Sequence, residues 1–223
     1  MNDKQKVAIH AAQLIQNDMI VGLGTGSTAN YFIEELARKH HQQGLHVQCV
    51  ASSIVSTIKA QELGLPVVSI EHISRLDIYV DGADEVTNDK ILLKGRGYDL
   101  VKEKVLAKAS DRFLVLADKT KLVSYIGQNY PIPVEVMPFA WKLVLASIEK
   151  VGGQAQLRAN SAGDGLAISS HGSLVLDARF PDTISASELN HVLSSIPGVV
   201  EHGVFESLAS TVFVADNGHI SEM

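Results

Sequence analysis

The chain has 223 residues, of which 46% are apolar, and its formal net charge is −6. This composition favours a folded protein of one large or two modest domains and argues against disorder. The acidic balance and the lack of a basic run argue against a general nucleic-acid or membrane-surface binder.

The single cysteine, Cys49, excludes a disulfide framework, so we expect a reducing, cytoplasmic setting. No apolar run reaches the length of a signal peptide or a membrane span, which predicts a soluble and unprocessed protein. The histidines show no metal-ligand spacing, and no metal site is expected.

A turn rich in glycine and hydroxyl groups follows the first predicted strand. Apolar spacing predicts a helix over residues 4–16 and a strand over 19–23, and Gly24 to Thr28 then lead into another helix. The free N–H groups and the dipole at a helix start favour an anion, so this segment fits a phosphate site. It matches neither the P-loop nor the dinucleotide fingerprint, because no Gly-Lys pair follows and Ala29 replaces the third glycine. An ordinary strand-to-helix turn is the alternative.

Further apolar runs predict strands over residues 47–51, 67–70 and 78–80, with a helix that runs through Leu63. Ser52 and Ser53 follow the first of these strands, and they either line a ligand crevice or cap the next helix. The segment Asp81 to Glu85 (DGADE) follows the third and combines carboxylates with small residues. Open parallel sheets bind ligands outside the carboxyl ends of their strands, so these carboxylates are candidate site residues.

The run 91–93 predicts another strand, which ends in Lys94 to Gly97 (KGRG). A helix follows, and Glu103 lies about one turn into it. The inner face of this helix is predicted to carry Leu100, Val101, Val105 and Leu106. Each motif alone is compatible with a simple turn or an exposed surface, whereas their clustering at consecutive strand ends indicates a functional site.

The order of elements predicts an α/β fold with two domains. Strands that alternate with helices, including one over residues 112–117, predict a Rossmann-like parallel sheet. Residues 132–205 follow the order β-α-β-β-α-β, which is the ferredoxin-like α+β pattern. A last strand over 210–215 could return to the large sheet. We therefore expect a Rossmann-like catalytic domain of residues 1–126 plus 207–223 and a smaller ferredoxin-like domain of residues 127–206.

Six short motifs between Gly22 and Pro138 together resemble ribose-5-phosphate isomerase of the A type, and with the ferredoxin-like half the resemblance covers nearly the whole chain. They are GLGTGSTA from Gly22, YVDGADEV from Tyr79, LLKGRG from Leu92, EK at Glu103, ADKTK from Ala117 and PVEVMP from Pro133. The resemblance implies a cofactor-free aldose-ketose isomerase that interconverts D-ribose 5-phosphate and D-ribulose 5-phosphate through an enediolate. It further implies a place in the non-oxidative branch of the pentose phosphate pathway and a homodimer or larger homo-oligomer.

Carried over position by position, the resemblance also implies roles for single residues. Glu103 is expected to be the base and Lys94 the partner of the developing oxyanion, two functions that such a proton transfer requires. Asp81 and Asp84 would hold the sugar hydroxyls, and Asp81 would assist ring opening. The substrate-binding residues implied are Thr28, Ala29, Asn30, Tyr31, Asp81, Gly82, Ala83, Asp84, Lys94, Gly95, Arg96, Gly97 and Lys121.

The lysine loop departs from the glycine-rich family pattern at Arg96, Tyr98 and Asp99, which bears on substrate preference and rate. Arg96 could reach the phosphate or lie on the surface. Two other functions compete with the isomerase. A sugar-phosphate sensor of a transcription regulator would need a basic DNA-binding helix, which the first 16 residues do not offer. An amino-sugar-phosphate deaminase would release ammonia from glucosamine 6-phosphate.

Overall fold

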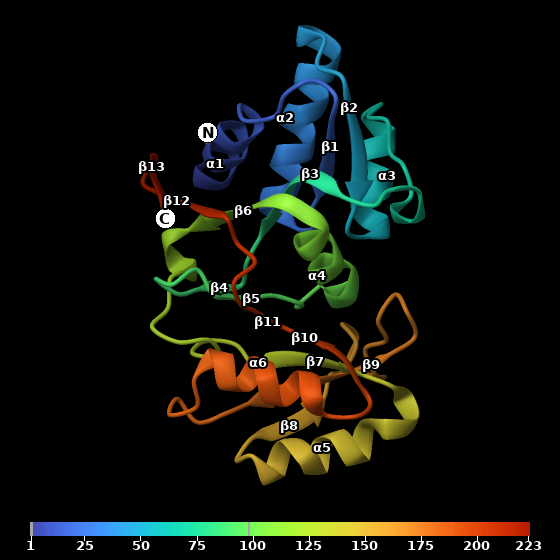
Figure 1. Ribbon diagram of the computed structural model, residues 1–223, viewed down its shortest axis with the longest axis vertical. Helices are drawn as coiled ribbons and strands as arrows, with labels where there is room; N and C mark the ends of the chain where they lie inside the picture. Colours follow the sequence, from blue (N-terminus) through green and yellow to red (C-terminus); the bar gives the residue numbers. More distant parts are fainter. Residues whose placement is uncertain (1, 98) are drawn as a thin grey trace. The chain divides into compact units, whose positions relative to one another are not determined.

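The computed structural model describes residues 2–97 and 99–223, so Tyr98 lies outside the described residues. The chain forms two compact units (Figure 1). The first comprises Met1–Ala83, Lys102–Leu122 and Ser207–Met223, and the second comprises Asp84–Val101 and Val123–Glu206. The domains expected from the sequence differ from these units because they assign residues 84–101 and 123–126 to the first domain. The division into folding domains of residues 1–126 plus 207–223 and residues 127–206 therefore stays a prediction.

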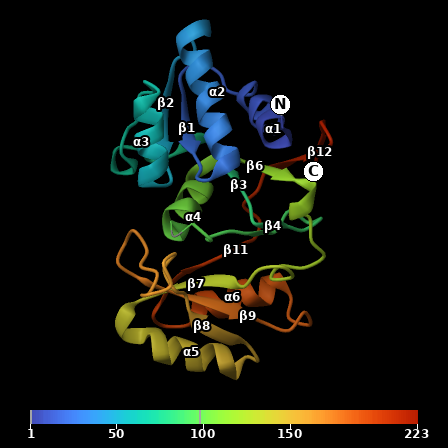
Figure 2. The ribbon, with the colours of Figure 1, turned by 180° about the vertical axis from the view of Figure 1, so that it is seen from behind.

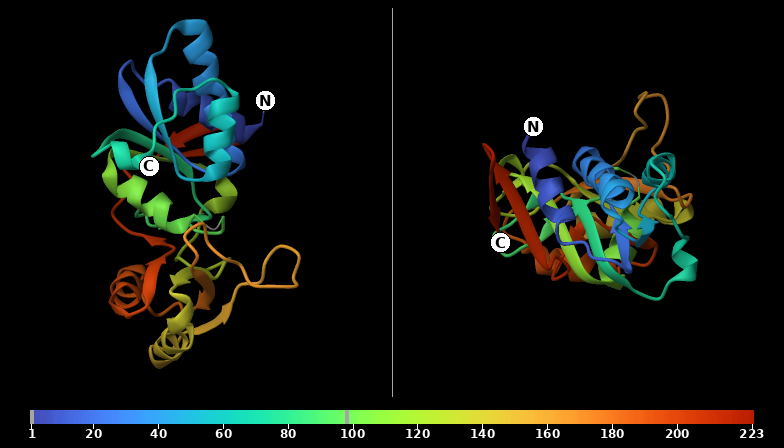
Figure 3. Two further views of the ribbon diagram at one scale, coloured as in Figure 1. Left: turned by 90° about the vertical axis from the view of Figure 1, so that its right-hand side faces the viewer. Right: turned by 90° about the horizontal axis from the view of Figure 1, so that it is seen from above.

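A six-stranded sheet in the order β13-β12-β6-β3-β1-β2 forms the first unit (Figure 3). All neighbouring strands are parallel except β12 and β13. The strands are β1 (Met19–Leu23), β2 (Val47–Ala51), β3 (Leu76–Gly82), β6 (Ser110–Asp118), β12 (Thr211–Asp216) and β13 (His219–Glu222). The helical elements are α1 (Asp3–Ala12), α2 (Ser27–Gln43), α3 (Ile54–Glu62), η1 (Ile70–His72) and η2 (Lys119–Lys121). The predicted Rossmann-like parallel sheet is confirmed, and the strand over 210–215 does belong to it.

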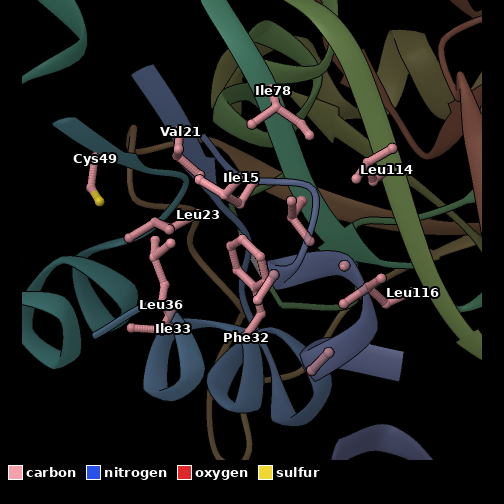
Figure 4. Packing of buried hydrophobic residues seen from close by; sticks show 14 of the residues in the cluster. Ile15, Val21, Leu23, Phe32, Ile33, Leu36, Cys49, Ile78, Leu114 and Leu116 are labelled. Atoms are coloured by element: carbon pink, nitrogen blue, oxygen red, sulfur yellow. The ribbon is translucent and has the colours of Figure 1, made fainter. Parts of the chain in front are cut away.

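The main core of this unit lies on one face of the sheet. Successive side chains of a strand point to opposite faces, so every second residue of β1, β3 and β6 is buried against the helices. Figure 4 shows Phe32, Ile33 and Leu36 of α2 packed against this face. The strand residues on it include Val21, Leu23, Ile78, Leu114 and Leu116. The opposite face carries Tyr79 and Phe113, whose rings stack with their centroids 4.8 Å apart.

One predicted strand of the first unit and one predicted inner-face residue of α4 are wrong. Residues 67–70 form no strand, because only Val67 makes a bridge to Cys49 before the chain turns into η1. Val105 of α4 (Leu100–Ala109) is 46% exposed and does not lie on the inner face. The buried face of α4 carries Leu100 and Leu106, as predicted, together with the charged residues Glu103 and Lys104, so the spacing of apolar residues misplaces Val105 alone.

A four-stranded antiparallel sheet in the order β10-β7-β9-β8 dominates the second unit (Figure 2). The helices α5 and α6 share one core with β7 and β9. Along the chain the elements are β7 (Ile132–Val136), η3 (Pro138–Ala140), α5 (Trp141–Lys150), β8 (Gln154–Leu157), β9 (Leu174–Arg179), α6 (Ala186–Ser195) and β10 (Val199–His202). This is the predicted ferredoxin-like order. A long loop that joins β8 to β9 stands away from these strands (Figure 3).

A separate three-stranded antiparallel sheet holds the segments on either side of the predicted lysine loop. It consists of β11 (Val204–Phe205), β5 (Leu92–Leu93) and β4 (Glu85–Val86). The run 91–93 is therefore a strand, but it does not belong to the large parallel sheet. The N–H of Asp84 donates to the carbonyl of Leu93 at 2.8 Å, and the N–H of Lys94 donates to Gly203 at 2.9 Å. This sheet therefore fixes the main chain of Asp84 and Lys94 within the second unit.

Among the described residues, no helix has both the length and the apolar character that crossing a lipid bilayer requires.

Burial makes Cys49 a chemically inert thiol. Desolvation raises the pKa of this side chain to about 12, and the reactive thiolate is therefore scarce at neutral pH. We expect the native protein to resist modification by Ellman's reagent at pH 8 and the unfolded protein to release one equivalent of the coloured product. Rapid stoichiometric reaction of the native protein would contradict this burial.

Candidate active site

The carboxylate of Asp81 binds the loop that follows β1. Asp81 is fully buried, and its Oδ1 accepts the N–H groups of Thr25 at 3.0 Å and Gly82 at 2.7 Å. Its Oδ2 accepts the hydroxyl of Tyr79 at 2.5 Å. Hydrogen bonds to an ionised acceptor are stronger than neutral ones, so this carboxylate ties the β1–α2 turn to the end of β3. The strand order reverses between β1 and β3, which is where open α/β sheets bind their ligands.

Positions 24 and 26 of this turn are glycine for two different physical reasons. A Cβ atom on Gly24 would lie 2.1 Å from Oδ1 of Asp81, so only glycine permits the close approach of the two segments. Gly26 has φ of 109° and precedes the first residue of α2, a backbone conformation that other residues rarely adopt. The turn is therefore shaped by its contact with a carboxylate as well as by its own backbone.

Hydroxyl groups surround the side chain of Thr25 beneath the turn. Its Oγ1 lies 2.9 Å from Oγ of Ser52, 2.7 Å from Oγ of Ser53 and 3.2 Å from Oγ of Ser56. Ser53 also caps α3, because its Oγ accepts the N–H of Ser56 at 3.1 Å. Both uses considered for Ser52 and Ser53 are thus partly realised: Ser53 caps a helix, and both serines support the turn.

The predicted phosphate-side residues form the start of α2. Ala29 is buried, whereas Thr28, Asn30 and Tyr31 are half-buried. Ser27 and Tyr31 line a pocket of about 640 Å³ together with Lys4 of α1. The ammonium of Lys4 donates to Oγ of Ser27 at 2.9 Å, which puts a positive charge beside the helix start. This combination suits an anion.

Ser27 lies in the Gly24–Thr28 segment that the sequence assigns to a phosphate site, whereas Lys4 was not predicted as a site residue. Their side chains meet across 23 positions of sequence, and Lys4 is one of several charged residues in an amphipathic helix. No local signal separated it from its neighbours.

The acidic residues of the same pocket are engaged locally. Asp3 accepts the N–H groups of Asn217 and Gly218 at 2.9 and 2.8 Å. Asp216 pairs with Lys119 at 2.8 Å, and Asp118, the third acid of this pocket, accepts the N–H of Thr120 at 3.0 Å. Lys121, the predicted further contact, ends η2 and is half-buried.

Within the first unit Glu103 lies near Tyr79, the residue whose hydroxyl binds Asp81. It is buried in the first turn of α4. Burial, and then the negative charges of Asp81 and Glu103, hold the pKa of Tyr79 well above its usual value. The Tyr79 hydroxyl therefore stays protonated and remains a hydrogen-bond donor. The first unit thus brings together Asp81, with its neighbours Gly82 and Ala83, and the predicted base Glu103.

The predicted residues of the lysine loop lie in the second unit. Lys94 is buried, and its Nζ lies 5.8 Å from the ring centroid of Phe205. Gly95 has φ of 94°, and Gly97 is exposed. The side chain of Arg96 does not extend freely into solvent, because its guanidinium carbon lies 4.0 Å from the ring centroid of Tyr130. One of its nitrogens also lies 3.8 Å from Oδ1 of Asp84.

Glu85, the last acid of the DGADE segment, has an architectural role. Its buried carboxylate accepts the N–H groups of Gly127 at 2.7 Å, Asn129 at 2.6 Å and Tyr130 at 3.0 Å. It therefore fixes the loop that carries Tyr130, on which Arg96 rests. Within residues 2–97 and 99–223, no three His, Cys, Asp or Glu side chains are grouped so that they could hold a metal ion.

Comparison with known proteins identifies the family. The model of the family "Ribose 5-phosphate isomerase A (phosphoriboisomerase A)" matches residues 48–219. The chain belongs to this family. The ribose-5-phosphate isomerase A of Thermococcus kodakarensis is 39% identical over 221 residues, which cover 99% of this chain and 96% of the relative. The enzyme of Pyrococcus furiosus is 39% identical over 212 residues, which cover 95% and 93%.

Solved structures agree with this assignment over the whole chain. Ribose 5-phosphate isomerase A from Methanocaldococcus jannaschii has a TM-score of 0.93 and 35% identity, and the match covers 99% of this chain and 97% of that one. A D-ribose-5-phosphate isomerase in complex with phospho-erythronic acid has a TM-score of 0.95 and 36% identity, with 100% and 99% covered. The resemblance drawn from the six motifs and the predicted fold class are both confirmed.

A methyl group at position 24 should disturb the Asp81 contact. We expect Gly24→Ala to lower the free energy of unfolding by about 1 to 3 kcal/mol, because the new Cβ would overlap a buried carboxylate. Gly97→Ala is the matched control, since a Cβ there meets no atom within 4 Å. Urea denaturation of both variants measures the difference, and equal stabilities would contradict the proposed close contact.

Proposed function

We propose that this protein interconverts D-ribose 5-phosphate and D-ribulose 5-phosphate by moving a proton between neighbouring carbons through an enediolate. Membership of the ribose 5-phosphate isomerase A family supports this reaction. The observation that carries it is the buried carboxylate of Glu103 near Tyr79, whose hydroxyl binds Asp81 at the end of β3.

In this proposal Glu103 is the general base. It lies in the first turn of α4, where the helix dipole favours the ionised carboxylate that a base requires. Lys94 faces the oxygen that becomes negative in the enediolate. A flexible ammonium suits this task, since it needs no fixed planar geometry to follow a charge that shifts between two oxygens.

Asp84 and Asp81 are assigned to the sugar itself. Asp84 is the more accessible of the two carboxylates and is proposed to hold substrate hydroxyls. Asp81 already accepts three hydrogen bonds from its own unit, and we propose that it assists ring opening while it keeps the β1–α2 turn in place. Gly82, Ala83, Gly95, Arg96 and Gly97 complete the proposed substrate contacts, in addition to the phosphate-side residues.

The phosphate group is assigned to the start of α2. Thr28, Ala29, Asn30 and Tyr31 belong to this helix end, and Lys4, Ser27 and Lys121 are proposed to add contacts. The N-terminal dipole of α2 and the Lys4 ammonium both favour a phosphate dianion there. One relative was solved in complex with phospho-erythronic acid, and we propose that this chain binds the same compound. Its carboxylate carries charge where an enediolate would, which is how a transition-state analogue gains affinity.

We also propose a homodimer or larger homo-oligomer that works in the cytoplasm, in the non-oxidative branch of the pentose phosphate pathway. The apolar side chains of Phe139 and Leu143 are 83% and 72% exposed, which supplies surface for a second copy to cover. The single buried cysteine suits a reducing compartment. Light scattering of the purified protein would give the mass of the assembly.

Removal of the base should abolish turnover without abolishing binding. We expect the wild-type protein to convert ribose 5-phosphate without added metal or nucleotide, and Glu103→Gln to lower kcat by at least about 100-fold, as loss of a general base does. The affinity for phospho-erythronic acid should change little, as calorimetry can measure. Glu149→Gln, on the exposed side of α5, is the matched control.

Retained turnover in Glu103→Gln would refute the base assignment. Ammonia release from glucosamine 6-phosphate would favour the deaminase, and sugar-phosphate binding with no turnover by the wild-type protein would favour the sensor.

Loss of the Lys4 ammonium should weaken substrate binding. We expect Lys4→Ala to raise KM roughly tenfold with kcat nearly unchanged, since a hydrogen bond to a charged group contributes about 1.5 to 3 kcal/mol. Steady-state kinetics at two ionic strengths measure the effect. Lys108→Ala, at the exposed end of α4, is the control. An unchanged KM would exclude Lys4 from the phosphate site.

A further inference from the structure

Arg158 and Asp177 form a rigid pair in the second unit. Arg158 directly follows β8, and its Nε donates to Oδ1 and Oδ2 of Asp177 at 3.1 and 3.0 Å. Its Nη2 donates to Oδ1 at 2.5 Å. The two side chains are only 12% and 18% exposed. A guanidinium bound in this forked way has its plane fixed, so its third nitrogen points in a defined direction.

That third nitrogen binds the main chain of the lysine loop, whose described residues are 94–97 and 99. Nη1 of Arg158 donates to the carbonyl of Gly95 at 3.1 Å and lies 3.5 Å from the carbonyl of Arg96. These are the two carbonyls that follow Lys94. The left-handed φ of Gly95 sets the direction of this part of the loop. Arg158 therefore constrains the backbone immediately beside Lys94.

Other contacts of the second unit hold side chains of the same loop. Oγ of Ser170 donates to Oδ1 of Asp99 at 2.5 Å. The Arg96 side chain rests on Tyr130, whose own N–H is held by Glu85. The small sheet holds the main chain up to Lys94 through the hydrogen bond to Gly203, and the Arg158 side chain holds the main chain that follows Lys94.

We propose that Arg158 is a positioning residue, which acts through the lysine loop to keep the Lys94 ammonium where the negative charge develops. This inference rests on the proposed function, because that function gives Lys94 its role at the oxyanion. Lysine cannot replace arginine here, since an ammonium lacks the planar fork that binds Asp177 and a carbonyl together. A merely structural ion pair between β8 and β9 would affect stability and leave the kinetics of the folded enzyme intact.

The test is a double-mutant cycle of Arg158→Lys and Lys94→Ala in the full-length protein. Misplacement of a catalytic group by about 1 Å can cost roughly 100-fold, so we expect Arg158→Lys alone to lower kcat by about 10- to 100-fold. KM should stay within about threefold, because the proposed phosphate contacts do not involve Arg158. Arg158→Lys alone should also weaken the binding of phospho-erythronic acid, whereas in the Lys94→Ala background it should lower neither kcat nor this affinity any further.

The matched control is Arg38→Lys. Arg38 makes a similar forked pair with Glu35, at 2.8 and 2.7 Å, and has no part in the lysine loop. Its substitution should leave kcat unchanged. If Arg158→Lys fails to fold, Asp177→Glu keeps both charges but displaces the guanidinium, and it should show the same coupling to Lys94 with a smaller loss of kcat.

The outcomes separate this inference from the proposed function. A lowered melting temperature with an unchanged kcat, or effects of Arg158→Lys and Lys94→Ala that simply multiply, would overturn the positioning role in an otherwise active isomerase. A wild-type protein that shows no isomerisation, yet binds phospho-erythronic acid with the expected coupling, would overturn the proposed function and support the positioning role.

Discussion

The fold of the first unit depends on the buried carboxylate of Asp81, which accepts hydrogen bonds from three groups. A carboxylate without water is costly unless hydrogen bonds replace its hydration, and Asp81 receives them from Thr25, Gly82 and Tyr79. Two of these donors are main-chain groups of the segments that the carboxylate joins. The β1–α2 turn and the end of β3 therefore have one low-energy arrangement, and Gly24 is glycine because that arrangement leaves no room for a side chain.

The alternation of β3 lets one short strand serve both the core and the site. Ile78 and Val80 face the helices, while Tyr79 and Asp81 face the other way. Tyr79 stacks on Phe113 and keeps its proton under the influence of two nearby carboxylates, so it works as a fixed donor. Helix α4 also carries core and candidate site residues together, because Glu103 is buried on the face that carries Leu106.

Regular, local features of the sequence were predictable. Apolar periodicity and turn residues gave most strands and helices, and the glycine-rich and acidic segments at strand ends pointed to the candidate site. The failures have physical causes. Residues 67–70 have strand composition, but the partly exposed run meets β2 at Val67 alone before η1 begins. In α4 only Val105 departs from the predicted inner face, because Glu103 and Lys104 occupy part of the buried side.

Contacts between distant polar side chains were beyond local reasoning. Lys4 reaches Ser27 across 23 positions, and Arg158 reaches Gly95 across 63. Neither pair belongs to a periodic pattern, so no window of sequence could reveal it. The same holds for the small antiparallel sheet, since the run 91–93 signals a strand but not the partner with which it pairs.

The contact between Glu85 and residues 127–130 has a consequence for the evolution and engineering of this chain. Three backbone donors converge on one carboxylate from a turn more than forty positions later, so the length of this turn is matched to the carboxylate. A residue added or deleted there would leave a charge stranded in the interior, although Gln128 and Asn129 are themselves exposed. This turn is therefore an unsuitable place to graft foreign sequence, despite its accessible surface.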